Sequence, residues 1–220
     1  MARKAKKRLW GLIDYQPRWG LTIKGWLIIL LGILLAIVLI LLRLQSFLAY
    51  NKPIAADVLI VEGWVGDGAI EGAIVEFNSR QYQLLITTGI PLGRGEHLTE
   101  YKNFAKLSEA TLITLGFDSD KIQAIPTPNV ERDRTLASAI AVKEWLKKSN
   151  LKVNGVNVYT DDVHSRRSWL LFKRVFEPEI AVGAIAHPPP DYDPQFWWTS
   201  SAGFRTVLSE GIAYIYAKFL

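Results

Sequence analysis

Hydrophobic positions follow two different patterns along the 220-residue chain. Positions 25–42 carry no charged residue, whereas from about residue 57 short apolar runs alternate with longer segments in which apolar residues recur every three or four positions. Short apolar runs bounded by turn residues are typical of buried strands, and the longer period is typical of amphipathic helices. The pattern predicts one apolar helix followed by alternating strands and helices.

The predicted elements form five strand–helix pairs. The strands are expected at residues 58–61, 84–88, 122–125, 156–160 and 180–184, and the helices at 69–80, 99–115, 135–148, 165–176 and 204–219. Such alternation is typical of parallel sheets with right-handed crossovers. We therefore expect an α/β, Rossmann-like open, mostly parallel five-stranded sheet with helices on both faces, preceded by one N-terminal transmembrane helix.

The uncharged stretch approaches the roughly 20 residues that cross a bilayer. Seven Lys/Arg residues precede it and only Arg43 and Lys52 closely follow it, so the positive-inside rule predicts a cytoplasmic N-terminus. A cleaved signal peptide or a buried core helix are the alternatives, but the length of the run and its basic flank favour an uncleaved anchor. We expect a cytoplasmic segment 1–20, a transmembrane helix 21–43, a linker 44–56 and an α/β domain 57–220. This topology predicts a single-pass protein of the plasma (inner) membrane with its domain on the outer, periplasmic face.

Charge divides at the same boundary. Residues 1–52 hold nine basic residues and one acidic residue, which leaves 17 of the 26 Lys/Arg and 20 of the 21 Asp/Glu in residues 53–220, a net charge of −3 for the domain. The basic residues therefore accompany the anchor, where the partner is the lipid bilayer, and the domain has no nucleic-acid footprint. The chain has no cysteine, which excludes disulfides, a thiol nucleophile and thiolate metal sites.

Ligands of open α/β sheets bind beyond the carboxyl ends of the strands. In this chain those ends are the loops at 62–68, 89–99, 126–134, 161–167 and 186–199. The loop at 161–167 is the most informative, because it places His164, Arg166 and Arg167 at the start of a helix, where free backbone N–H groups attract anions. The alternative is that the two arginines face solvent or pair with Asp161 and Asp162.

Two earlier strand ends also carry candidate site residues. Glu62 and Gly63 open a glycine-rich turn, in which the carboxylate is a general base, a metal ligand or simply a helix cap. Thr88 and Gly89 could donate hydrogen bonds to an anion or just end a strand. Glu100 lies at the start of a predicted helix, where an acidic residue also suits the helix dipole.

The later loops add further candidates. Asp133 could cap the next helix, with Arg134 and Thr135 lining a site, although alternating charges are also typical of solvated loops. Trp197 could form an apolar wall or pack in the core. The three histidines show no close-spaced pair, so a zinc site has little support. The cofactor is unknown, and a divalent metal held by carboxylates is possible.

The ordered pieces from residue 57 onward resemble the YdcF-like family of envelope proteins, a domain of unknown function. The matching pieces are residues 57–61, Thr87-Thr88-Gly89, Glu100, Arg134-Thr135, residues 160–167, Trp197 and Glu210. The most specific is 160–167, which is close to the family's Thr-Ser-x-x-His-x-x-Arg motif and begins at Thr160. The chain departs from the family at Ser138, where an Asn is expected, and in its glycine-rich first turn. The resemblance implies a Rossmann-like domain, often membrane-anchored, that is linked to peptidoglycan or lipid-carrier processes.

Together these features predict a membrane-anchored envelope protein that acts on a phosphorylated or otherwise anionic ligand, which could be lipid-linked. Water is the simplest nucleophile in such a site. The expected catalytic residues are His164 as general acid or base and Glu62, Glu100 and Asp133 as partners. The expected ligand-binding residues are Gly63, Thr88, Gly89, Arg134, Thr135, Thr160, Arg166, Arg167 and Trp197. A non-catalytic binding module of envelope assembly, and a structural protein that docks partners, are the alternatives.

Overall fold

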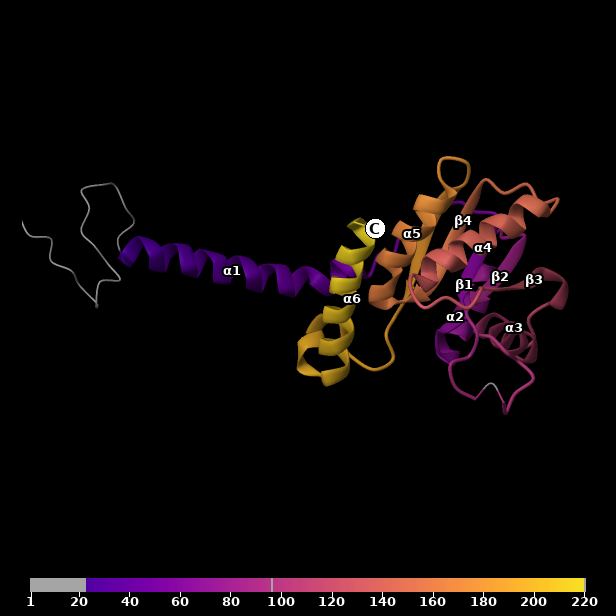
Figure 1. Ribbon diagram of the computed structural model, residues 1–220, viewed down its shortest axis with the longest axis horizontal. Helices are drawn as coiled ribbons and strands as arrows, with labels where there is room; N and C mark the ends of the chain where they lie inside the picture. The colour runs from indigo at the N-terminus through magenta and orange to yellow at the C-terminus, as the bar shows by residue number, and fades with distance from the viewer. Residues whose placement is uncertain (1–22, 96, 220) are drawn as a thin grey trace, which may run out of the picture. The chain divides into compact units, whose positions relative to one another are not determined.

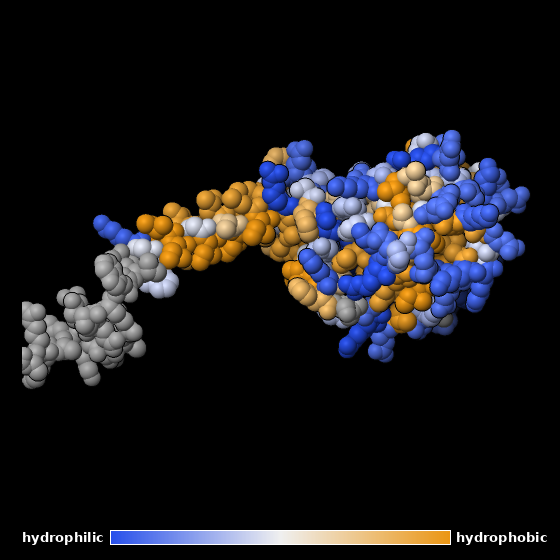
Figure 2. Space-filling model, turned by 90° about the horizontal axis from the view of Figure 1, so that it is seen from above, coloured by the Kyte–Doolittle hydropathy of each residue, from blue (hydrophilic) through white to orange (hydrophobic). Residues whose placement is uncertain are grey.

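A computed structural model describes residues 23–95 and 97–219 (Figure 1). The chain forms two compact units that meet between Leu42 and Arg43. The first unit is described from Ile23 and is the exposed, apolar part of helix α1 (Ile23–Leu48), which is long and apolar enough to cross a membrane. On the face that Figure 2 shows, this helix is almost entirely apolar, whereas the second unit carries many polar side chains. The predicted basic segment 1–20 lies outside the described residues.

The prediction of a linker from residue 44 was wrong at its start, because α1 remains helical to Leu48. Leu48 is fully buried in a small core cluster of the second unit, with Val163, Trp197 and Val207, and Leu44 packs against it. Burial of one face stabilises the last turns of the helix. The polypeptide between Leu48 and the first strand then continues without regular secondary structure.

The second unit is built on a five-stranded sheet, as predicted. Its strands are β1 (Val58–Glu62), β2 (Leu84–Gly89), β3 (Ile122–Pro126), β4 (Gly155–Asp161) and β5 (Ala181–His187). The strand order is β3-β2-β1-β4-β5 and all four pairings are parallel. The direction of the crossovers therefore changes between β1 and β4, at the centre of the sheet.

The helices of the domain are α2 (Asp67–Ser79), α3 (Phe104–Thr114), α4 (Arg134–Lys148), α5 (Ser165–Phe176) and α6 (Ser201–Phe219). They confirm the prediction of helices on both faces of the sheet. In β1, Leu59 and Val61 pack with residues of α2 and α3, whereas Val58 and Ile60 pack with residues of α4 and α5. A central strand buried on both faces explains the continuous apolar run that predicted it.

Helix α3 begins five residues later than predicted. The helix start is set by Asn103, whose side chain accepts a hydrogen bond from the backbone N–H of Lys106. Residues before it form a loop that is closed by the hydrogen bond from the Leu92 N–H to the Lys102 carbonyl. The apolar period extended the predicted helix into this loop, because periodicity alone does not reveal the cap.

Candidate functional site

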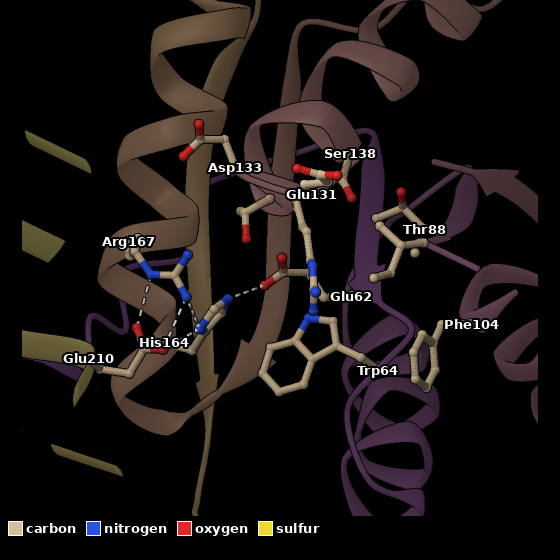
Figure 3. A pocket seen from close by; sticks show the side chains of 14 residues that line it. Glu62, Trp64, Thr88, Phe104, Glu131, Asp133, Ser138, His164, Arg167 and Glu210 are labelled. Carbon is tan, nitrogen blue, oxygen red and sulfur yellow. Dashed lines mark hydrogen bonds and ion pairs between the residues drawn. The ribbon is translucent and has the colours of Figure 1, made fainter. Parts of the chain in front are cut away.

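A cavity of about 580 Å³, the main cavity of the predicted site, lies at the carboxyl edge of the sheet (Figure 3). The residues that line it are Glu62, Trp64, Thr88, Gly89, Ile90, Phe104, Glu131, Asp133, Arg134, Thr135, Ser138, His164, Arg167 and Glu210. They come from the ends of β1 and β2, the start of α3, the loop before α4 and its first turns, the junction of η2 and α5, and the middle of α6. The cavity therefore occupies the place that the reversal of crossover direction between β1 and β4 creates.

His164 is the centre of a buried charge network. It closes a one-turn 3-10 helix, η2 (Asp162–His164), that joins β4 directly to α5, so its ring projects beside the end of β1. Its Nδ1 lies 3.0 Å from Glu210 Oε1, and its Nε2 lies 3.5 Å from Glu62 Oε2. The residue is 8% exposed. An imidazole placed between two carboxylates is held as a cation.

Arg167 supplies the second cation of the network. Its Nε donates to Glu210 Oε2 and its Nη2 donates to Glu210 Oε1, both at 3.0 Å. The same Nη2 lies 2.9 Å from His164 Nδ1. When His164 is protonated, its Nδ1–H donates to Glu210 and this close approach brings two positive groups together, so the shared carboxylate must offset their repulsion.

The network sets the pKa of each member. Burial works to lower the pKa of His164, but the negative charge of Glu62 and the hydrogen bond to Glu210 raise it to about 9. Burial works to raise the pKa of Glu210, but its hydrogen bond and ion pair with His164, together with Arg167, lower it to about 2. At neutral pH the site thus holds an imidazolium flanked by two ionised carboxylates. Such a histidine can donate a proton but cannot accept one.

Glu62 is the most deeply buried carboxylate of the site and is 2% exposed. Its Oε2 accepts a hydrogen bond of 2.6 Å from Ser168 Oγ, one turn into α5. Burial works to raise the pKa of Glu62, but His164, Ser168 and Thr160 lower it below its usual range. A low pKa makes Glu62 a weak base, and its principal effect is to keep His164 charged.

The opposite wall of the cavity offers hydroxyl groups and an unpaired arginine. Thr88, Thr127 and Ser138 are joined by hydroxyl hydrogen bonds of 3.2 Å and 2.8 Å. Arg134 is exposed and makes no ion pair with any described residue. Asp133 precedes α4 with a left-handed backbone (φ 54°), and its side chain does not cap the helix. The first-turn N–H groups of α4 therefore have no side-chain cap beside the cavity.

Most of the predicted site residues lie together in this cavity. These are Glu62, Thr88, Gly89, Asp133, Arg134, Thr135, His164 and Arg167. They come from four separate strand ends, so their convergence results from the parallel order of the sheet.

Arg166 and Trp197 do not line the cavity. Arg166 donates to the carbonyl of Phe47, and its guanidinium lies 4.0 Å from the centre of the Phe47 ring, because neighbouring residues of a helix point in different directions. Trp197 is 2% exposed and packs in the cluster around Leu48. Neither side chain can contact a ligand in the cavity as it stands.

Three further predicted residues have other positions. Glu100 is exposed in the loop before α3, which begins at Phe104. Thr160 is fully buried beside Glu62 and is not part of the cavity wall. Gly63 is needed for packing, since a Cβ there would lie 2.6 Å from the Phe104 carbonyl oxygen.

Several residues that line the cavity were not predicted as site residues from the sequence. Glu210 binds both cations but lies in the third turn of α6, far from any strand end, and only the family resemblance singled it out. Trp64 packs edge-on against His164, with ring centres 4.7 Å apart, and Phe104 lines the cavity from the start of α3 (Figure 3). Ile90, Glu131 and Ser138 complete this set and lie close in the sequence to residues that were predicted.

No group of three or more His, Cys, Asp or Glu side chains that could hold a metal ion occurs within residues 23–95 and 97–219. Glu62 and Glu210 approach His164 from its two ring nitrogens, so these three residues pair with one another. No protein-family model matches the chain, and no curated protein matches its sequence significantly.

Proposed function

We propose that this chain is a membrane-anchored envelope protein whose cavity binds a phosphorylated or otherwise anionic ligand. The observation that carries the proposal is the convergence of Thr88, Arg134, His164 and Arg167, from four strand ends, on one cavity of about 580 Å³. This convergence is also what the proposed YdcF-like relationship requires, since those residues belong to its motifs. The basic N-terminal sequence and α1 support a cytoplasmic N-terminus and an outward-facing domain.

The anion is held, in this proposal, by Arg134 and the start of α4. Arg134 is the cation of the cavity that has no carboxylate partner among the described residues, and a guanidinium binds phosphate through paired donors. The uncapped first turn of α4 and the hydroxyls of Thr135 and Thr88 add neutral donors. Arg167 contributes through its remaining N–H groups.

The cavity also contains carboxylates that limit the choice of ligand. Glu131 and Asp133 line it without ion-pair partners among the described residues. Carboxylates repel a bare polyanion but accept hydrogen bonds from hydroxyl groups. A phosphorylated sugar, including the head group of a lipid-linked peptidoglycan or polysaccharide intermediate, offers both the anion and the hydroxyl donors.

Hydrolysis of a phosphate ester is the reaction that this arrangement supports best. Water attacks phosphorus and forms a new P–O bond while the bond to the leaving oxygen breaks. His164, protonated at neutral pH, stabilises the negative charge that develops on the leaving oxygen, which takes its proton from solvent, and Asp133 accepts the proton that water loses. Glu62 and Glu210 hold the imidazolium in position.

One observation favours a non-catalytic binding or regulatory module as the second candidate. Efficient acid–base catalysts have a pKa near the working pH, whereas the pKa of His164 is raised to about 9 and that of Glu210 is lowered to about 2. Charges that do not change near neutral pH are suited to binding a charged ligand and do not require proton transfer.

The test compares the full-length chain in nanodiscs with matched variants. Binding of inorganic phosphate, a sugar phosphate and a polyprenyl-pyrophosphate analogue is measured by calorimetry, with and without Mg²⁺. Arg134→Gln should weaken binding about 10- to 100-fold, the loss expected for a charge-assisted hydrogen bond. Arg132→Gln is the control, because Arg132 is exposed on the same loop and does not line the main cavity.

Turnover separates the two candidates. If His164→Gln retains binding but releases no phosphate from a ligand that the wild type hydrolyses, the enzyme is supported. Binding without release in the wild type favours the binding module. Equal affinity of wild type, Arg134→Gln and Arg132→Gln for every ligand would rule out the anion pocket.

A further inference from the structure

Helix α6 has an exposed apolar stripe that the core does not use. Ile212 is 71% exposed, Ile215 59%, Tyr216 55% and Phe219 84%. These positions follow the i, i+3, i+4, i+7 spacing of one helix face. Four large apolar side chains on one face of a helix form a contiguous patch, which is typical of an interaction surface.

The opposite face of α6 already packs in the domain. Val207, Gly211 and Ala217 are buried, and Gly203 lies against the turn of η3 (Pro194–Thr199). The helix is therefore apolar on two sides. The four side chains of the exposed stripe are mostly exposed to solvent. Core packing therefore does not explain why these four positions are apolar.

Helix α6 contacts residues 44–47, which closely follow the uncharged stretch in the sequence. Gly211 lies against Leu44, whose side-chain carbon is 3.4 Å from where a Cβ would stand, and Tyr214 packs edge-on against Phe47 with ring centres 5.4 Å apart. Leu44 and Phe47 belong to the same helix as the apolar stretch that ends at Leu42. They are two and five residues beyond Leu42, so chain connectivity keeps α6 near the end of the proposed membrane span.

The stripe also adjoins the ligand cavity. Ile212 and Tyr216 line a second, shallow hollow of about 520 Å³ together with Arg132 and Asp133. Asp133 lines the main cavity as well. The hollow thus shares Ile212 and Tyr216 with the apolar stripe and Asp133 with the main cavity.

We propose that α6 is an interfacial helix, which seats Ile212, Ile215, Tyr216 and Phe219 in the headgroup layer of the bilayer that α1 crosses. The partner is a lipid surface, because chain continuity brings α6 to the headgroup layer. An aromatic and aliphatic stripe is the surface that such a layer accepts. This inference rests on the proposed membrane anchor and deepens it. Binding of α6 to the bilayer would bring the Asp133 side of the cavity within reach of a lipid-linked ligand.

The test uses the absence of cysteine, so that one introduced cysteine carries one fluorescent label. Full-length Ile215→Cys, Leu34→Cys and Val75→Cys are labelled and reconstituted in vesicles of equal parts phosphatidylcholine and phosphatidylglycerol. Leu34 reports on the proposed anchor, and Val75 on α2 is a matched control that is 70% exposed. Quenching by brominated lipids is compared with quenching by aqueous iodide.

We expect the label at Ile215 to be quenched by brominated lipid severalfold more than the label at Val75, approaching the label at Leu34. Adding Ile212→Glu and Phe219→Glu should make the label at Ile215 accessible to quenching by aqueous iodide. Lipid quenching at Leu34 with only iodide quenching at Ile215 would overturn the interfacial position of α6 and leave the proposed anchor intact. Iodide quenching at all three sites would overturn the anchor itself. Shielding of Ile215 from both quenchers would show that a second protein surface covers it, which also overturns the proposal.

Discussion

Arg167 binds Glu210 through two parallel hydrogen bonds, each 3.0 Å long. The pair joins the first turn of α5 to the middle of α6 and closes one side of the cavity. Because Glu210 also accepts from His164, the removal of either partner leaves a charge that is largely shielded from water.

A double-mutant cycle on Arg167→Met and Glu210→Gln measures this pair. Each single change should lower the free energy of unfolding by about 3 kcal/mol, because Glu210→Gln leaves Arg167 and His164 without their shared carboxylate and Arg167→Met leaves Glu210 with His164 alone. The double variant should cost clearly less than the sum of the two, since it leaves neither charge behind. Chemical denaturation gives the three values.

The exposed pair Lys173–Glu177 is the control for that cycle. Its nitrogen–oxygen distance is 3.4 Å and both side chains are about two-fifths exposed. Its coupling energy should lie within about 0.5 kcal/mol of zero. Equal coupling energies for the two pairs would show that burial does not strengthen the Arg167–Glu210 interaction.

The stability of the domain should fall as the pH rises from about 6.5 to about 9. The folded-state pKa of His164 is raised above its ordinary value of 6.5, so its contribution is complete below 6.5 and disappears as the pH passes about 9. The full contribution is on the order of 3 kcal/mol. The difference in unfolding free energy between wild type and His164→Gln, measured by denaturation at several pH values, should shrink over this interval. A difference that stays constant from pH 6 to 9.5 would show that His164 is not held as a cation.

Leu48→Ala should destabilise the domain although Leu48 belongs to the helix that begins in the proposed membrane span. The side chain is fully buried with Val163 and Val207, so its loss should cost about 3 kcal/mol. Leu41→Ala is the matched control, since Leu41 lies in the same helix but is exposed and precedes the second unit. Hydrogen exchange of the β4 amides reports on the domain in both variants. Equal exchange rates would mean that Leu48 does not contribute to the core.

Gly63→Ala tests the close packing between the first turn and α3. The new Cβ would meet the Phe104 carbonyl oxygen at 2.6 Å and Ser108 Oγ at 2.9 Å, so the domain should lose about 2 kcal/mol. Gly68→Ala is the control, because Gly68 lies in α2 with nothing within 4 Å and should gain about 0.5 kcal/mol. Thermal melts of both variants provide the comparison. A neutral Gly63→Ala would show that α3 shifts at little cost.

The sequence pattern was sufficient for the sheet and for much of the site. Largely apolar runs of four or five residues marked all five strands, and the rule of the carboxyl edge then located Glu62, Thr88 and His164 in one place. Boundaries were less accurate where a cap or a distant contact decides them. The start of α3 depends on the Asn103 cap, and the end of α1 depends on Leu48 burial.

Which of Arg166 and Arg167 lines the cavity could not be predicted from the sequence. Adjacent helical residues point about 100° apart, and which of them faces the cavity depends on how α5 is rotated against the sheet. Here Arg167 faces Glu210, and Arg166 faces Phe47 and Tyr50. Glu210 was equally hidden, because only the docking of α6 brings it to His164.

The dependence of the charge network on Glu210 has a consequence for biosynthesis. Glu62, His164 and Arg167 are synthesised before Glu210. Until α6 has been made, Glu62, which lies 3.5 Å from His164, is therefore the one carboxylate of this network. A chain that stops short of α6 keeps a surplus positive charge where the finished protein has a balanced one. A chain truncated before α6 should therefore be less stable and more open to proteolysis than the full-length chain.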